Sequence, residues 1–449
     1  MTKQHVTQPI AIIGAGLTGL TLAYYLQKNG VPVTIFEKSD RIGGVIKSFK
    51  NRGFIYEQGP NSGTLSNIET VNLLDELSGD IEIDLANETA KKRLIWKNNQ
   101  WEALPDSLIT GIKTPLFNFK DKLNILLEPF KKKGNNPDES IAGMVKRRLG
   151  QSFLDYAVDP FISGIYAGDP NYLVTRYALP KLYHLEQTYG SFIKGALQKA
   201  KEPKTTEQKR VTKQIFSVKG GLEELVKTLG EKIGQKNIQT GQSHLCIQQV
   251  ENGYTVNNHF FSKIISTVPA DQLSSIFPFI TPTLLTPIQS LKYAPVVEIG
   301  LGFHQWGGRD LNAFGGLVPG KENRHILGLL FMSSIFKDRA PKNGALFTLF
   351  VGGTKRPELT ALSADKLLSI VQKDFMEMMN IETFNPELVY IKSYKKAIAQ
   401  YGKDSALRLE NIEKIQKKYP GIILAGSIRD GVGMADRIKQ AKNMADQLI

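Results

Sequence analysis

Residues 10–26 read IAIIGAGLTGLTLAYYL, and residues 33–37 read VTIFE. This order is typical of an apolar strand, a glycine turn, an apolar helix and a second apolar strand that ends in an acid. Gly14 permits the tight turn, Gly16 lets the backbone approach a pyrophosphate, and Gly19 lets the helix pack closely on the strand. The start of the helix offers free N–H groups and the positive end of its dipole to phosphates. The stretch therefore predicts a dinucleotide site.

The acid at the end of the second strand supports this prediction. Glu37 can accept hydrogen bonds from both hydroxyls of an adenosine ribose, and it would repel a 2′-phosphate. A glycine-rich turn in an ordinary α/β core does not require an acid in this register. We expect the nucleotide to contact Glu37, its neighbour Lys38 and the turn residues Gly14, Ala15, Gly16, Leu17, Thr18 and Gly19.

Two further segments favour a flavin over a nicotinamide cofactor. Residues 41–44 read RIGG, and residues 57–62 read EQGPNS, so small residues can cover an extended dinucleotide. The guanidinium of Arg41 matches phosphate oxygens. The pattern of Glu37, Arg41 and the diglycine resembles glutathione-reductase-like and amine-oxidase-like FAD proteins. We therefore expect FAD, with contacts from Arg41, Gly43, Gly44, Val45, Gly59, Pro60, Asn61 and Ser62.

The C-terminal segment predicts a second approach to the cofactor. An apolar strand at 422–426 is followed by the turn Gly431-Val-Gly433 and a terminal helix. Such a turn directs another helix N-terminus at a ligand. We expect contacts from Gly426, Ser427, Val432, Gly433 and Met434.

Composition limits the class of protein. The 449 residues predict two or three domains, and the net charge of +14 favours acidic partners such as a polycarboxylate or an anionic membrane surface. No nucleic-acid-binding module is present in the sequence. The single Cys246 cannot form an intrachain disulfide, and the six histidines lack metal-ligand spacing. Glycines interrupt the apolar run from Ile10, so we expect neither a signal peptide nor a membrane-spanning helix.

Residues 108–210 differ in character from the rest of the chain. Apolar and basic residues alternate there at helical spacing, which predicts an inserted helical domain with a basic surface. We expect residues 66–85 to be helical and residues 199–213 to form a mobile loop. Residues 290–395 alternate strand-like and loop-like segments, which suggests a mixed sheet.

Several longer segments resemble the oxygen-dependent protoporphyrinogen oxidases, within the amine-oxidase-like FAD superfamily. The resemblance runs nearly end to end, and its most particular part is SGIYAGDP at 163–170. The other segments are EQGPNS at 57–62, FSVKGG at 216–221, FGGLVP at 314–319 and LAGSIRDGVG at 424–433.

The resemblance implies an α/β (α+β) fold with three interwoven parts. A Rossmann-like FAD-binding domain would comprise residues 1–85, 211–285 and 401–449. A mixed-sheet substrate domain would comprise residues 86–107 and 286–400. The helical insert at 108–210 would close the pocket and face a membrane. The implied location is cytoplasmic, or peripheral at the inner face of the cytoplasmic membrane.

The resemblance also implies the reaction and the substrate contacts. Protoporphyrinogen IX would lose hydride to the flavin, with dioxygen as the final acceptor and hydrogen peroxide as a product, in haem biosynthesis. No acid–base set is apparent in the sequence, which fits chemistry supplied by the flavin. Phe314 and Leu317 would sandwich the tetrapyrrole, Phe350 would line the pocket, and a carbonyl at Gly164 would face the ring. Relatives often place a propionate-binding arginine shortly after the position of Leu104-Pro105; this chain has none there, and Lys113 would be its substitute.

Other readings stay open at this point. Coproporphyrinogen III is the nearest alternative substrate, and its four carboxylates suit the positive charge equally well. An amine oxidase or a carotenoid desaturase on the same scaffold is a more distant enzyme. A non-catalytic flavin-binding or haem-precursor-binding protein at a membrane is the alternative from another class. No feature of the sequence sets the oligomeric state.

Overall fold

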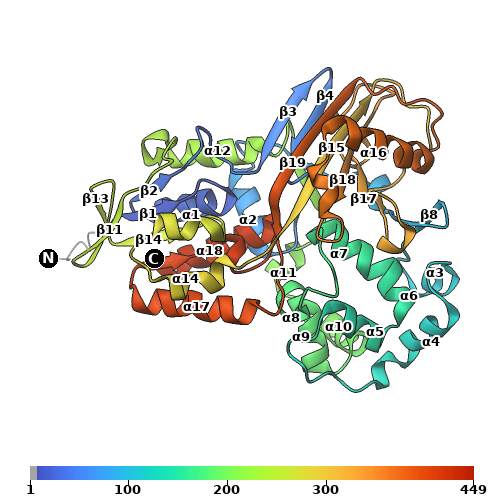
Figure 1. Ribbon diagram of the computed structural model, residues 1–449, viewed down its shortest axis with the longest axis horizontal. Coiled ribbons are helices and arrows are strands. Elements are labelled where there is room, and N and C mark those ends of the chain that lie inside the picture. Colours follow the sequence, from blue (N-terminus) through green and yellow to red (C-terminus); the bar gives the residue numbers. More distant parts are fainter. Residues whose placement is uncertain (1–7) are drawn as a thin grey trace.

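The computed structural model describes residues 8–449 of the chain, and a five-stranded parallel sheet lies in the left half of the molecule as viewed in Figure 1. Its strands come from three distant parts of the sequence, so both ends of the chain meet in one sheet. In sheet order they are β10 (Ile238–Gln239), β2 (Val33–Phe36), β1 (Ile10–Ile13), β14 (Lys263–Ser266) and β20 (Ile422–Leu424). The predicted strand, helix and second strand at the N-terminus are all present.

Both faces of this sheet are buried, which explains the continuous apolar sequence of β1. Ile10 and Ile12 face one core, and Ala11 and Ile13 face the other. Fully burying one such aliphatic side chain stabilises the fold by about 1.5–3 kcal/mol. The first core holds α1 (Leu17–Lys28), α2 (Ile68–Leu77), α12 (Glu223–Ile233) and α18 (Met434–Leu448). The second holds α13 (Leu273–Ile276), α14 (Pro282–Gln289) and α17 (Ser405–Lys418).

The described residues also form three small sheets. The helix predicted for 66–85 ends at Leu77, because the chain continues as strand β6 (Ile83–Leu85), which pairs with β9 (Ile215–Val218). The small sheets contain β3 (Lys47–Asn51) with β4 (Phe54–Gln58); β5 (Gly63–Thr64), β9 (Ile215–Val218) and β6 (Ile83–Leu85); and β11 (Ile247–Val250), β12 (Gly253–Val256) and β13 (His259–Phe261).

A seven-stranded mixed sheet forms the second half of the molecule (Figure 1). Its outer face packs on α16 (Ala364–Met379), and its inner face packs on α15 (Met332–Ile335) and turns toward the parallel sheet and the helical insert. In sheet order the strands are β19 (Leu388–Ala399), β15 (Tyr293–Phe303), β18 (Ala345–Gly352), β17 (Ile326–Phe331), β16 (Gly315–Leu317), β7 (Arg93–Lys97) and β8 (Gln100–Ala103). Only the β16–β7 pair is parallel.

Helices fill residues 108–210, at the lower right of Figure 1. Part of the loop expected at 199–213 is helical, because Thr205 and Gln208 cap α11 reciprocally. A π-helical turn at Leu154–Val158 joins α6 to α7. The helices are α3 (Leu108–Lys113), α4 (Phe119–Leu127), α5 (Ile141–Arg148), α6 (Gln151–Phe153), α7 (Asp159–Tyr166), α8 (Thr175–Ala178), α9 (Pro180–Tyr189), α10 (Phe192–Lys201) and α11 (Thr206–Arg210).

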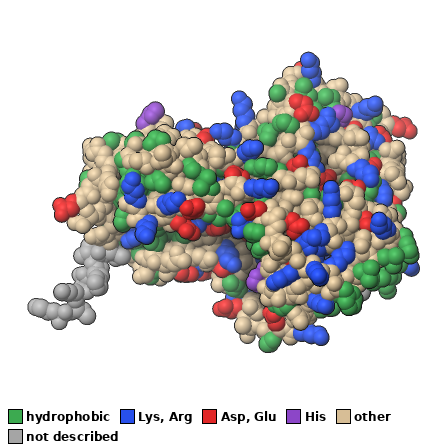
Figure 2. Space-filling view, turned by 60° about the horizontal axis from the view of Figure 1, so that its bottom comes forward, with side chains coloured by type: hydrophobic (Ala, Val, Ile, Leu, Met, Phe, Trp, Pro, Cys, Tyr) green, Lys and Arg blue, Asp and Glu red, His purple; other side chains and the backbone are tan. Residues whose placement is uncertain are grey.

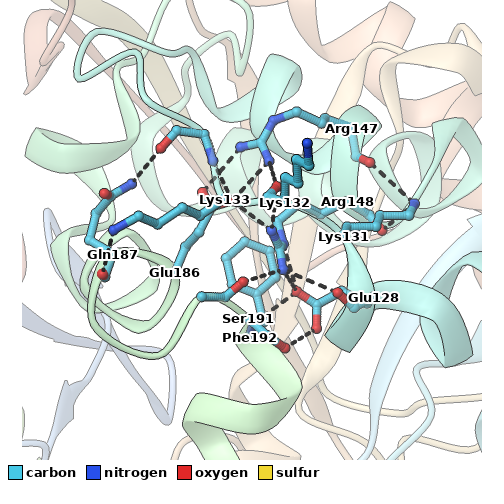
Figure 3. Close-up of polar contacts among 12 residues, drawn as sticks. Glu128, Lys131, Lys132, Lys133, Arg147, Arg148, Glu186, Gln187, Ser191 and Phe192 are labelled. Atoms are coloured by element: carbon cyan, nitrogen blue, oxygen red, sulfur yellow. Dashed lines mark hydrogen bonds and ion pairs between the residues drawn. The ribbon is translucent and has the colours of Figure 1, made fainter.

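A buried ion-pair network organises this helical region (Figure 3). Arg148 is fully buried and pairs with Glu128 at 2.5 Å and with Glu186 at 2.7 Å. Glu128 also accepts hydrogen bonds from Ser191 Oγ and from the backbone N–H of Phe192, at the start of α10. Burial alone would raise the pKa of Glu128, but these hydrogen bonds outweigh burial and lower it. The network therefore holds α5, α9 and α10 together through charged, desolvated contacts.

Candidate functional site

The glycine turn between β1 and α1 has the geometry that the sequence predicts. Gly14 has a φ of +103°, and a Cβ at Gly19 would lie 2.0 Å from the carbonyl oxygen of Gly14. A Cβ at Gly16 would meet no atom within 4 Å, and Gly16 caps α1 without a side-chain hydrogen bond. The start of α1 is therefore open, as an approaching pyrophosphate requires, and Leu17 and Thr18 begin the helix there.

Glu37 lies at the carboxyl end of β2 and faces this turn. Its Oε2 accepts the backbone N–H of Ala15 at 2.7 Å, and its Oε1 accepts the N–H of Ser39 at 2.9 Å. The carboxylate is thus fixed beside the start of α1, with further lone pairs available to a ribose. Lys38 beside it is exposed.

The loop at 41–46 covers the glycine turn. The N–H of Gly43 donates to the carbonyl of Ala15 at 2.8 Å, and a Cβ at Gly44 would lie 3.1 Å from Gly16 Cα. Arg41 donates to three backbone carbonyls of this loop, those of Ile42, Gly44 and Ile46. The predicted contact between Arg41 and a phosphate stays a prediction. Val45 is 63% exposed.

The segment Gly59–Ser62 packs against the 41–46 loop. A Cβ at Gly59 would lie 2.3 Å from the carbonyl oxygen of Val45, and Gly59 has a φ of +99°. Asn61 is buried, and Pro60 and Ser62 on either side are partly exposed. Gly59–Ser62 therefore lies close to the glycine turn, as the predicted flavin cover requires.

A buried acid that the sequence analysis did not identify anchors this segment. Glu298 Oε2 accepts the N–H of Gly59 at 2.8 Å, and Glu298 Oε1 accepts from Asn61 Nδ2 at 2.7 Å. Thr348 Oγ1 donates to Asn61 Oδ1 at 2.8 Å. Burial raises the pKa of Glu298 to about 7, although both hydrogen bonds act in the opposite direction. The sequence feature that could have identified Glu298 is its position as a single acid within the apolar strand β15.

The C-terminal segment meets the glycine turn in space. A Cβ at Gly14 would lie 2.7 Å from Thr267 Oγ1, and a Cβ at Gly426 would lie 2.8 Å from the carbonyl oxygen of Thr267. Gly426 also donates its N–H to Gln440 Oε1 at 2.7 Å. Thr267 therefore separates the two predicted cofactor segments, and α18 packs along α1.

The remaining C-terminal candidates lie between Gly426 and the start of α18. Tyr401 donates its hydroxyl to the carbonyl of Ser427 at 2.8 Å, which fixes this turn from beneath. Val432 is partly buried, Gly433 caps α18, and Met434 is buried as its first residue.

The predicted substrate residues lie on the inner side of the mixed sheet and on α7. A Cβ at Gly164 would be 2.6 Å from Leu317 Cδ2, so α7 contacts β16 at this point. Phe350 pairs in register with Glu298 across β18 and β15, which puts both side chains on one face. Phe314 packs in a different cluster, with Phe54 and Tyr56. The structure thus brings Leu317 to Gly164 and Phe350 to Glu298.

Lys113 stands apart from these pocket residues. It is exposed at the end of α3, and its proposed role toward a substrate carboxylate stays a prediction.

A site with an open helix start, a fixed acid, and two loops and a C-terminal turn around them fits an extended dinucleotide.

Comparison with known proteins gives the class. The family described as flavin containing amine oxidoreductase matches residues 17–449. The mitochondrial protoporphyrinogen oxidase of Nicotiana tabacum is 31% identical over 100% of this chain and 96% of its own length. The coproporphyrinogen III oxidase of Bacillus subtilis (strain 168) is 25% identical over 98% of this chain and 97% of its own length. A crystal structure of a protein from Exiguobacterium sp. 255-15 superposes with a TM-score of 0.81 at 22% identity, covering 98% of each chain.

The fold and the site together define a flavin-dependent oxidoreductase of mixed α/β class. The chain belongs to the flavin-containing amine oxidoreductase family, and its cofactor is FAD. The predictions of the fold class, of the superfamily and of the cofactor are confirmed.

Proposed function

We propose that this protein oxidises protoporphyrinogen IX to protoporphyrin IX, with dioxygen as the acceptor and hydrogen peroxide as a product. The main observation behind the proposal is the apolar contact of Leu317 with Gly164, on a wall shared with Phe350. Glu298, the neighbour of Phe350 on β15, anchors the Gly59–Ser62 segment. Flat apolar surface beside a flavin suits a tetrapyrrole. The full-length relatives named as protoporphyrinogen oxidases support the same substrate.

The division of labour follows from the chemistry of the cofactor. FAD accepts hydride from a methylene carbon and passes electrons to dioxygen. The residues of the chain then need only bind, orient and shield the ring. Glu37 and the glycine turn would hold the nucleotide, and the Gly59–Ser62 segment would cover the flavin. Leu317 and Phe350 would exclude water from one side of the macrocycle.

An anaerobic mixing experiment tests the proposal. The yellow holoprotein, mixed with protoporphyrinogen IX without dioxygen, should lose its flavin absorbance, and the absorbance should return when air is admitted. Dithionite bleaching of the same sample is the control for a reducible flavin. A flavin that dithionite bleaches but neither porphyrinogen reduces would exclude this function and favour a binding protein or another amine-oxidase-like enzyme.

Coproporphyrinogen III is the second candidate substrate. The Bacillus subtilis relative carries that name, and it covers nearly the whole chain at lower identity than the mitochondrial protoporphyrinogen oxidase of Nicotiana tabacum. Coproporphyrinogen needs cations for two additional carboxylates. A higher kcat/KM for coproporphyrinogen in the same assay would move the assignment to it.

We also propose that residues 108–210 form a peripheral membrane surface. Large apolar side chains are exposed on α3, on α4 and just after α4, and hydrophobic side chains gather at the right edge of Figure 2, the side on which these helices lie in Figure 1. The most exposed are Ile109 (67%), Ile112 (69%), Phe119 (75%), Leu126 (66%) and Phe130 (81%). Exposed lysines at 113, 120, 132 and 133 suit anionic lipid.

This surface would let the protein lie against the inner face of the cytoplasmic membrane. Across residues 8–449, no helix combines the length and the apolar character needed to cross a bilayer. We also propose the domain division that we predicted from the sequence, in which residues 108–210 form the insert.

A further inference from the structure

Glu298 is an unusual residue for its position. It is 1% exposed on the inner face of β15, where its neighbours along that face are Val296 and Gly300. Its two close hydrogen bonds come from neutral donors, the N–H of Gly59 and the amide of Asn61. Burying a carboxylate costs free energy unless a cation or several donors offset the loss of water. At Glu298 the two close donors are neutral, so they offset the loss of water without a paired cation.

Charged side chains from the neighbouring strands β4 and β19 lie near Glu298. On β4, the carboxylate of Glu57 adds negative charge, but Arg339 pairs with it at 2.8 Å. On β19, Lys392 stands opposite Glu298 in register and is exposed to solvent. The nearest cations are therefore paired elsewhere or solvated.

Two tyrosines of β19 complete the surroundings. Tyr390 donates its hydroxyl to the carbonyl of Glu57 at 2.8 Å and lies 3.5 Å from Glu298 Oε1. Burial raises the pKa of Tyr394, and the nearby carboxylate of Glu298 raises it further, while Arg41 lowers it. Both phenols therefore stay protonated at neutral pH, and neither supplies the positive charge that would fix Glu298 as an anion.

Gain of a proton changes what Glu298 can hold. Both oxygens of the ionised carboxylate face N–H donors, at 2.8 Å and 2.7 Å. A protonated carboxyl has one oxygen that donates and accepts only weakly, so one of these two hydrogen bonds must weaken. Because burial raises the pKa of Glu298 to about 7, both forms are populated near neutral pH. The strength of the hydrogen bonds between Glu298 and the Gly59–Ser62 segment therefore depends on whether Glu298 is protonated.

We propose that Glu298 is a proton-dependent positioning residue, which holds the Gly59–Ser62 segment through Gly59 and Asn61 and thereby sets how that segment meets the bound flavin. The proposal rests on the part of the proposed function that puts this segment over the flavin, and it is independent of which porphyrinogen is oxidised. It assigns to this chain a group that couples the pH to the flavin environment without a contact to substrate.

The test is a pH titration of the oxidised holoprotein without substrate, read by flavin absorbance. In the wild type the absorbance should change with a single transition between about pH 6 and 8. The Glu298→Gln variant should retain FAD and lose the transition. Glu382→Gln removes an exposed carboxylate elsewhere and should titrate as the wild type does. A transition that persists unchanged in Glu298→Gln would overturn the proposal.

A second measurement decides the matter if Glu298→Gln does not retain FAD. Infrared difference spectra of the wild-type holoprotein should then show a protonated carboxyl that disappears across the same pH interval, and its absence would equally overturn the proposal. These readouts need no porphyrinogen. A protein that fails to oxidise either porphyrinogen but shows the Glu298 transition would contradict the proposed substrate and leave this inference standing.

Discussion

At the scale of single residues, Glu37 holds the glycine turn and is the side chain that we expect to bind the ribose of the cofactor. Its carboxylate accepts the N–H of Ala15 in the glycine turn and the N–H of Ser39 in its own loop. These two donors fix the orientation of the carboxylate before a cofactor arrives, which reduces the entropy that binding must overcome. The position of Glu37 was predictable from the sequence, because it depends only on the register at the end of β2.

The Glu37→Ala variant should bind FAD more weakly while the rest of the fold persists. Loss of a charge-assisted hydrogen bond to a ribose should cost about 1.5–3 kcal/mol of binding free energy. The flavin content after purification and the dissociation constant by fluorescence measure this effect. Asp40→Ala, an exposed neighbour, is the matched control. Wild-type flavin affinity in Glu37→Ala would remove Glu37 from the site.

The charge of Glu298 should also appear in the stability of the protein. Its folded-state pKa of about 7 lies above the usual value of 4.5, so the folded protein retains this proton to higher pH than the unfolded chain does. The wild type should therefore lose stability relative to Glu298→Gln as the pH rises between these two values, by up to about 1.4 kcal/mol per pH unit. Denaturant unfolding of both proteins across this interval measures the difference, and parallel curves would contradict it.

Phe314 and Leu317 illustrate a prediction that the structure leaves open. We predicted from the sequence that both lie against the macrocycle, but the structure places them in different apolar clusters. Phe314 packs with Phe54 and Tyr56, whereas Leu317 packs with Ile95 and Tyr156 and contacts Gly164. Leu317 therefore has the clearer place in the pocket wall, and the sandwich of the ring by both residues stays a prediction.

Kinetics of single variants test this pair. Phe314→Ala should keep its FAD and lower kcat/KM for a porphyrinogen by about 10- to 150-fold if it contacts the ring. Leu317→Asp should be worse than Leu317→Ala, because it buries a charge beside an anionic ligand. Wild-type kcat/KM in Phe314→Ala and in Leu317→Asp would place the pocket elsewhere.

At the scale of elements, the helical insert combines a rigid interior with an apolar exterior. Arg148, Glu128 and Glu186 are fully buried and tie the helices together, so the insert does not depend on covering its exposed apolar side chains. Soluble monomers rarely expose so many large apolar residues on neighbouring elements. The exposed apolar side chains of α3 and α4 are therefore suited to contact a lipid or protein surface.

The membrane proposal predicts binding to anionic vesicles. Phosphatidylglycerol liposomes should co-sediment the wild type, and binding should fall as salt rises through physiological strength, because exposed lysines are screened. The double variant Phe119→Ser with Phe130→Ser should bind markedly less. Leu407→Ser, on α17, removes an exposed leucine outside the insert and should bind normally. Equal binding by all three proteins, or none by the wild type, would reject this surface.

Local elements were predictable from the sequence, and distant pairings were not. The strand, turn and helix at Ile10–Lys28 follow from apolar spacing and glycines within one short segment. The pairing of β7 with β16, or of β6 with β9, depends on contacts between distant segments that no local pattern encodes. Glu298 was missed for the same reason, since only the register of β15 and the approach of Asn61 give it a role.

At the scale of the whole molecule, the candidate site is assembled from remote parts of the chain. The glycine turn, the Gly59–Ser62 segment and the Gly426 turn converge, with Thr267 between the first and the last. Loss of FAD should therefore loosen contacts along the entire sequence, since a ligand that binds only the folded state stabilises it as a unit. We expect the mixed sheet and the helical insert to close the substrate side.

The most direct test of the central claim is steady-state oxidation by the FAD-loaded protein, followed by porphyrin fluorescence with protoporphyrinogen IX and coproporphyrinogen III side by side. We expect porphyrin fluorescence that requires the protein and dioxygen, hydrogen peroxide as a product, and a higher kcat/KM for protoporphyrinogen IX. A fully flavin-loaded protein that oxidises neither porphyrinogen in air would contradict it.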